Sequence, residues 1–174
     1  MKNKTLMSLL LIAALPAVAA VDNAQLPENV RVPPGHAEKL QVQGEGTIVY
    51  VCRAKPGATE QYEWTLLEPR ATLYNAQRQV VGQYYAGPRW DLNDGSQAVG
   101  KPVAGVASPG GIPLQLVKVD ETRGEGALRN TSYVQRLATR GGLPPTGLCD
   151  KVNERAVEEV PYQATYVFYQ PAPR

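Results

Sequence analysis

Short runs of residues that alternate between two faces recur along this chain and restrict its fold. In residues 47–53, for example, Ile48, Tyr50 and Cys52 share one face. Comparable runs occupy residues 62–67, 71–74, 80–85, 112–119, 131–138 and 163–169. A period of two, with many β-branched and aromatic residues, is typical of β-strands. Tyr50 and Trp64 lie on the more apolar faces of their runs, so we expect both side chains to be largely buried.

Glycine and proline separate these runs and disfavour helices. The chain has 16 glycines and 15 prolines among its 174 residues, and both residue types weaken helix interiors. Turn sequences occur at Pro56-Gly57, Asn93-Asp94-Gly95, Pro109-Gly110-Gly111 and Gly141-Gly142. Only residues 150–160 have loose helical spacing, so at most one short helix is expected there. We therefore predict an all-β fold, either an antiparallel β-sandwich or a barrel.

Residues 1–20 have the parts of a secretory signal peptide. A basic start with Lys2 and Lys4 precedes a nearly unbroken apolar run, which ends at the small residues Ala19 and Ala20. The run is shorter than the ~20 residues that a membrane-spanning helix needs. We expect cleavage, export to the periplasm or the medium of a bacterium, and no transmembrane segment in the mature chain.

The predicted cleavage sets the domain organisation and the charge of the mature protein. Residues 21–36 would form an extended, proline-bearing arm, and residues 37–174 a single β domain. Without Lys2 and Lys4 the chain has 16 basic and 16 acidic side chains. A neutral domain lacks the field that attracts nucleic acid or anionic lipid, so neither is expected as a partner.

The mature chain contains two cysteines, Cys52 and Cys149. In an oxidising compartment, two cysteines in one chain are typical of a disulfide. In the chain-entropy model, a bridge across so long a loop would stabilise the fold by ~4–5 kcal/mol. A redox pair would normally have Cys-x-x-Cys spacing, which is absent. A single histidine, His36, excludes any metal site or catalytic dyad that needs two. Asp91, Asn93 and Asp94 lie close together as in a calcium loop, but their spacing misses the EF-hand pattern. No metal or cofactor is therefore expected.

The segment 82–96 has the densest combination of aromatic and polar residues. The candidate ligand-binding side chains there are Tyr84, Tyr85, Arg89, Trp90, Asp91 and Asp94. Aromatic faces beside hydrogen-bonding groups suit a carbohydrate or a small aromatic ligand. We expect a bend at Gly87-Pro88 to bring both faces of the segment toward one cleft. In the alternative interpretation, Trp90 and one tyrosine are core residues and Asn93-Asp94-Gly95 is a hairpin turn.

Three functions compete at this point. The leading hypothesis is a non-catalytic exported protein that binds a small molecule or carbohydrate, or that is associated with the cell envelope. The alternative is a small exported hydrolase that uses scattered acids or His36, although no Gly-x-Ser-x-Gly nucleophile motif is present. The third is a structural interaction protein of the envelope.

Several segments, taken in order, resemble one known family. They are Val32-Pro33-Pro34-Gly35-His36, Ile48 to Cys52, Ala86-Gly87-Pro88-Arg89-Trp90, Gly110 to Pro113, Gln135 to Thr139 and Tyr166 to Tyr169. This pattern is similar to the domain-of-unknown-function family 3455, exported proteins of bacteria and fungi. Where the family often has a histidine before the aromatic residue, this chain has Tyr84, and Leu114 replaces a frequent tryptophan. The resemblance implies one exported fold unit and brings no mechanism.

Overall fold

The computed structural model describes residues 21–58 and 60–173, and the predicted signal peptide lies outside them. Two 3-10 turns, η1 (Asn23–Gln25) and η2 (Glu28–Val30), precede the strands. The strands are β1 (His36–Ala54), β2 (Tyr62–Tyr74), β3 (Val80–Tyr85), β4 (Arg89–Leu92), β5 (Gln97–Ser108), β6 (Gly111–Arg123), β7 (Tyr133–Gly141) and β8 (Val157–Pro171). The fold is therefore all-β, as predicted.

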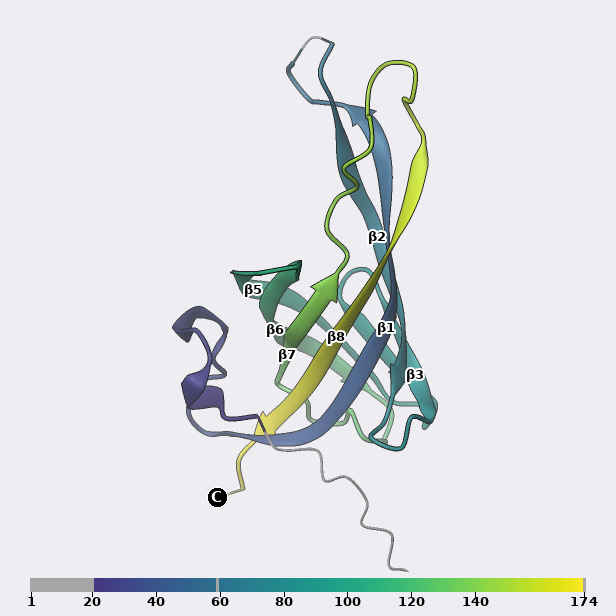
Figure 1. The fold of residues 1–174 in the computed structure, drawn as a ribbon. Coiled ribbons are helices and arrows are strands. Elements are labelled where there is room, and N and C mark those ends of the chain that lie inside the picture. The colour runs from purple at the N-terminus through teal and green to yellow at the C-terminus, as the bar shows by residue number, and fades with distance from the viewer. Residues whose placement is uncertain (1–20, 59, 174) are drawn as a thin grey trace, which may run out of the picture.

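The eight strands form a closed barrel in which each strand pairs with its sequence neighbours (Figure 1). All pairings are antiparallel, and β8 closes the barrel by pairing with β1 from His36↔Pro171 to Val51↔Val157. Of the two predicted architectures, the chain adopts the barrel. Closure pairs the first and last strands with each other, although the upper part of β2 pairs with β1 alone and most of β5 pairs with β6 alone.

The side chains that point inward fill the middle of the barrel. Tyr84, Trp90, Tyr166 and Phe168 are each no more than 4% exposed. The Trp90 ring lies 5.4 Å from that of Tyr84 and 5.7 Å from those of Tyr166 and Phe168, measured between ring centroids. In an eight-stranded barrel the interior is just wide enough for side chains to fill it. This aromatic cluster therefore separates the two ends of the barrel.

The long hairpin β1–β2 and the β7–β8 connection rise together above one end of the barrel, the upper end in Figure 1. The predicted disulfide is confirmed: Cys52 on β1 is bonded to Cys149 in the connection, with 5.5 Å between the α-carbons. The Tyr50 hydroxyl donates to the Gly142 carbonyl at 2.7 Å, and the Trp64 indole N–H donates to the Gly147 carbonyl at 2.9 Å. These three contacts hold the connection against the hairpin.

The N-terminal arm covers the outer face of β6, β7 and β8. Val30 and Val32 pack there against Leu137 and Val167 in a second apolar cluster. Gln135 joins arm to barrel because its amide nitrogen donates to the Val30 carbonyl at 2.6 Å, while its amide oxygen accepts from the Tyr169 hydroxyl. The arm is thus a packed part of the fold that includes two 3-10 turns.

The structure differs from the sequence-based expectation in four respects. The runs 62–67 and 71–74 form the single strand β2, and strands β4 and β5 were not predicted as strands. The loosely helical stretch 150–160 contains no helix: Asp150 accepts the N–H groups of Val152 and Asn153 in a turn, and β8 begins at Val157. Tyr50 is buried as expected, but Trp64 is only half-buried.

Candidate functional site

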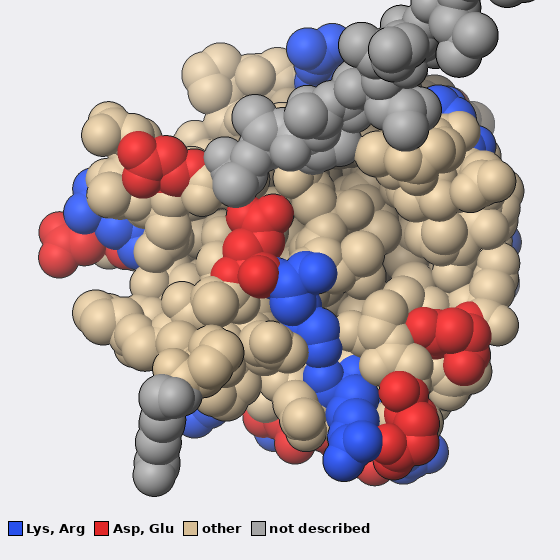
Figure 2. Space-filling view, turned by 90° about the horizontal axis from the view of Figure 1, so that it is seen from below, with Lys and Arg blue, Asp and Glu red and all other residues tan. Residues whose placement is uncertain are grey.

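The barrel has an apolar cavity at each end. The lower end, where β1 begins and β8 ends in Figure 1, holds a cavity of about 420 Å³. Figure 2 looks onto this end, where the surface is hollowed and uncharged residues predominate around the hollow. We call this the lower cavity; its lining residues are Leu40, Val42, Asn75, Val80, Val81, Leu92, Asn93, Asp94 and Ala127.

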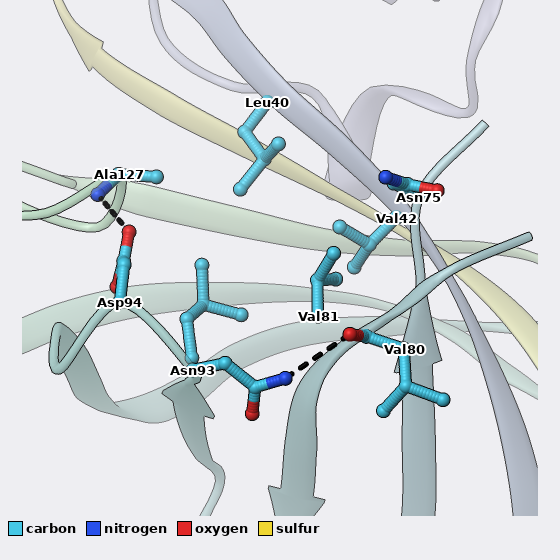
Figure 3. A pocket seen from close by; sticks show the side chains of 9 residues that line it. Leu40, Val42, Asn75, Val80, Val81, Asn93, Asp94 and Ala127 are labelled. Atoms are coloured by element: carbon cyan, nitrogen blue, oxygen red, sulfur yellow. Dashed lines mark hydrogen bonds between the residues drawn. The ribbon is translucent and has the colours of Figure 1, made fainter. Parts of the chain in front are cut away.

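Apolar side chains from separate strands form the inner wall of the lower cavity. Leu40 and Val42 come from β1 and Val81 from β3, and Figure 3 shows them pointing into the same space. Val42 is the deepest of the three, at 1% exposed, and belongs to the barrel core. The cavity is therefore a continuation of the core that is open to solvent at the rim.

The polar groups at the rim of the lower cavity already have partners. Asp94 accepts the Ala127 N–H at 2.7 Å and the Ser96 hydroxyl at 2.6 Å, and the Asn93 amide donates to the Val80 carbonyl at 3.0 Å (Figure 3). Partial burial raises the pKa of Asp94, but these donors outweigh it and hold the pKa below its usual range. These polar groups at the rim are hydrogen-bonded within turns of the chain. A ligand in the lower cavity would therefore make mainly apolar contacts.

The upper end holds a second cavity, of about 370 Å³, between the barrel and the β7–β8 connection. We call this the upper cavity; its lining residues are Ile48, Tyr50, Trp64, Leu66, Pro69, Ile112, Pro113, Arg136, Leu143 and Pro144. Arg136 is half-buried, and its Nε and Nη2 atoms donate to the Pro113 carbonyl at 3.2 and 3.0 Å. A guanidinium group thus lies among apolar walls.

Tyrosine hydroxyl groups lie inside the barrel near Arg136. Burial raises the pKa values of Tyr84, Tyr162 and Tyr166, and the positive charge of Arg136 partly opposes each shift. The Tyr162 and Tyr166 hydroxyl oxygens are 3.1 Å apart and share a hydrogen bond. These groups stay neutral at physiological pH.

We expect the free energy of unfolding to fall above about pH 10, the pKa of tyrosine in an unfolded chain. Burial raises the pKa of Tyr169 to about 12 and that of Tyr166 well above its usual value. Between about pH 10 and about pH 12, these tyrosines are deprotonated in the unfolded chain but still protonated in the folded chain. Raising the pH through this range therefore favours unfolding. Urea unfolding at several pH values, with tyrosinate absorbance followed in parallel, checks this. Equal stability at pH 9 and pH 11.5 would contradict it.

The candidate residues of segment 82–96 divide between the two faces of the sheet. Strands β3 and β4 pair with Tyr84 opposite Trp90 and Tyr85 opposite Arg89. Tyr84 and Trp90 point into the core, whereas Tyr85 and Arg89 are exposed. The expectation that a bend at Gly87-Pro88 brings both faces to one cleft is wrong, because a regular hairpin keeps residues of one parity on one side.

On the outer face, Arg89 pairs with Asp91 and its guanidinium lies over the Tyr85 ring, 5.5 Å from the centroid. The Arg89 Nε donates to Asp91 at 2.7 Å. None of the described cavities includes these three residues. Of the six candidates, only Asp94 lines a cavity directly.

His36, the residue named as a candidate for hydrolysis, contacts a backbone carbonyl and a tyrosine ring. The His36 Nδ1 lies 3.0 Å from the Pro33 carbonyl oxygen, and the ring meets that of Tyr133 edge-on. Ser96 is one of the serines that could serve as a nucleophile, but its hydroxyl donates to Asp94 and accepts the Leu128 N–H. Within the described part of the chain, no hydrogen bond links the histidine to a serine or a carboxylate.

Sequence reasoning missed Arg136 and the apolar residues of the lower cavity. A signal for Arg136 was present: in the alternating run 131–138 it shares the inward face with Val134, which is a core residue. A charge on the apolar face of a strand marks a position worth testing. Val80, Leu92 and Ala127 had no comparable signal, because they are remote in sequence and meet only after folding.

Together these features define a class of protein: a small up-and-down β-barrel with an aromatic plug and an apolar cavity at each end. Barrels of this size can hold one small ligand. Residues 33–170 match the family described as protein of unknown function (DUF3455). The chain belongs to this family, which confirms the resemblance seen in the sequence.

Comparison with curated proteins and with solved structures gave no significant match. No helix in residues 21–58 and 60–173 has the length and apolar character required to span a membrane.

Proposed function

We propose that this protein is a non-catalytic, exported small-molecule-binding barrel whose lower cavity takes an apolar ligand. The observation that carries the proposal is an open cavity of about 420 Å³ that continues the barrel core. Ligand cavities are typically ~300–1,000 Å³ and mostly apolar. An apolar molecule would gain free energy by covering Leu40, Val81 and Leu92, which are only partly buried.

The chemistry of the lower cavity favours an apolar ligand over a carbohydrate. A sugar needs free donors and acceptors beside an exposed aromatic face. The carboxylate of Asp94 and the side chains of Asn75 and Asn93 are already engaged in turns. No aromatic residue is among the described residues that line this cavity.

Two observations support the exported location as part of the proposal. Residues 1–20 have the composition of a signal peptide. The Cys52–Cys149 disulfide is typical of oxidising compartments such as the periplasm or the medium. We place the binding function there, in the cell envelope or outside it.

We expect Val80→Asp to weaken binding of the neutral fluorescent probe N-phenyl-1-naphthylamine about tenfold, which corresponds to ~1.4 kcal/mol. Val80 lies on the cavity rim and is 51% exposed, so an aspartate fits without disturbing the core. An apolar ligand would have to desolvate the new carboxylate. Fluorescence titration of the probe measures the change.

Val103→Asp is the matched control for this experiment. Val103 on β5 is 54% exposed and lines none of the described cavities. This variant carries the same charge change and should bind the probe like the wild type. Equal binding by all three proteins, or no binding by the wild type, would refute the proposal.

A further inference from the structure

The upper cavity contains a cation without an anionic partner. Arg136 is half-buried on β7, where Val134 shares its inward face and Gln135 and Leu137 face outward. In the described part of the chain no ion pair includes Arg136. The other described arginines without an ion pair are exposed to solvent, whereas Arg136 lies in the upper cavity. The partners of its guanidinium among the described residues are neutral groups, the Pro113 carbonyl and the Tyr84 hydroxyl.

The guanidinium also keeps hydrogen-bonding capacity. Arginine has five N–H donors in a planar fork. The Tyr84 hydroxyl interacts with the guanidinium from inside the barrel, and two bonds, from Nε and Nη2, go to one acceptor, the Pro113 carbonyl. That contact orients the side chain in the cavity. A group that is charged, oriented and incompletely bonded at an apolar site is suited to receive an anion.

The remaining walls of the upper cavity offer apolar surface. Ile48, Leu66 and Ile112 are aliphatic. The polar atoms of the two aromatic residues are already used, since the Tyr50 hydroxyl and the Trp64 indole N–H bond to carbonyl groups of the β7–β8 connection. Their rings are left to contact the body of a ligand. Arg136 is the one charged residue among the described lining residues, so the cavity matches a single negative charge.

We propose that the upper cavity binds an apolar monocarboxylate, with its carboxylate on Arg136 and its hydrocarbon body against Trp64 and Ile112. The cavity volume of about 370 Å³ accommodates a medium-length or compact hydrocarbon body. This site is separate from the lower cavity and differs from it in chemistry, so the inference does not rest on the function proposed above.

The test uses decanoate as the probe and decanol as its neutral match. The chain has two tryptophans, and only Trp64 lines the upper cavity. Its indole N–H signal in ¹H–¹⁵N NMR spectra, assigned with Trp64→Phe, therefore reports binding at this site alone. We expect decanoate to shift the signal saturably and decanol to bind at least about tenfold more weakly.

Arg136→Met should lower the decanoate affinity about tenfold and leave that for decanol unchanged. Arg140→Met is the matched control, because Arg140 is on the same strand, exposed and outside the upper cavity. If Arg136→Met does not fold, Leu143→Asp tests the same site with a second variant. Leu143 is 46% exposed on the rim, and the new carboxylate should repel decanoate more than decanol.

The inference is overturned if decanoate leaves the Trp64 signal unchanged, if decanol binds as tightly, or if Arg136→Met and Leu143→Asp bind decanoate like the wild type. None of these outcomes decides the proposal for the lower cavity, which the N-phenyl-1-naphthylamine titration tests separately. Val80→Asp should leave the decanoate response of Trp64 unchanged.

Discussion

Replacing Trp90 with alanine is expected to lower the free energy of unfolding by about 3–5 kcal/mol. Trp90 is 1% exposed and contacts Tyr84, Tyr166 and Phe168 in the middle of the barrel. Truncation removes the apolar transfer free energy of the largest core side chain and leaves a cavity that the closed sheet cannot collapse to fill. Denaturant unfolding followed by circular dichroism measures the loss.

Trp64→Ala is the matched control for Trp90→Ala. Trp64 is only half-buried, on the upper cavity, and its indole N–H bonds to the Gly147 carbonyl. Losing this side chain removes less buried area and one hydrogen bond, so we expect a clearly smaller change in the free energy of unfolding. Equal losses in the two variants would contradict the view that Trp90 is the centre of the core.

Removing the disulfide is expected to cost ~4–5 kcal/mol of stability in the chain-entropy model. Cys52 and Cys149 are 97 residues apart, so the bridge greatly restricts the unfolded chain. The double variant Cys52→Ala/Cys149→Ala also loosens the β7–β8 connection, which is then held to the hairpin by the hydrogen bonds of Tyr50 and Trp64 and by backbone bonds of residue 52 to Arg155 and Ala156. Denaturant unfolding gives the global change, and limited proteolysis locates the freed segment.

The control for the disulfide variant is the wild type measured with and without a reductant. The reduced wild type should approach the stability of the double variant, and the double variant should not respond to the reductant. A double variant as stable as the oxidised wild type would show that the bridge does not stabilise the fold. If the protease first cleaved the double variant outside the β7–β8 connection, the expectation that this connection is loosened would be wrong.

The local pattern in the sequence predicted most of the strands but not all of them. Residues 80–85 were predicted with the bounds that β3 has in the structure. Strand β5 was missed because Gly100, Pro102 and Gly105 interrupt its alternation. Gly100 and Pro102 lie where the pairing of β5 with β6 shifts register. A β-carbon on Gly100 would also collide with the backbone of Lys118, so glycine there serves close strand approach.

The candidate site was predicted only in part, for a similar reason. In a regular extended chain, alternation puts Tyr84 and Trp90 on one face of segment 82–96 and Tyr85, Arg89 and Asp91 on the other. The structure keeps this separation, contrary to the expected bend that would bring the two faces together. Alternation could not indicate which face would be the interior of a barrel. The aromatic residues that suggested a ligand site form the core plug instead, and whether segment 82–96 contributes to binding stays a prediction.

The sequence by itself determined the all-β class, the pairing of Cys52 with Cys149 and membership of the DUF3455 family. Each depends on local alternation, on the number of cysteines or on the order of short motifs. Only the tertiary structure decided that β8 closes on β1, and that Val80 and Ala127 line one cavity while Arg136 lines another. Closure depends on the number, tilt and register of all strands together. Each cavity forms where closure of the barrel brings together residues that are distant in the sequence. A local alternation pattern cannot predict which residues these are.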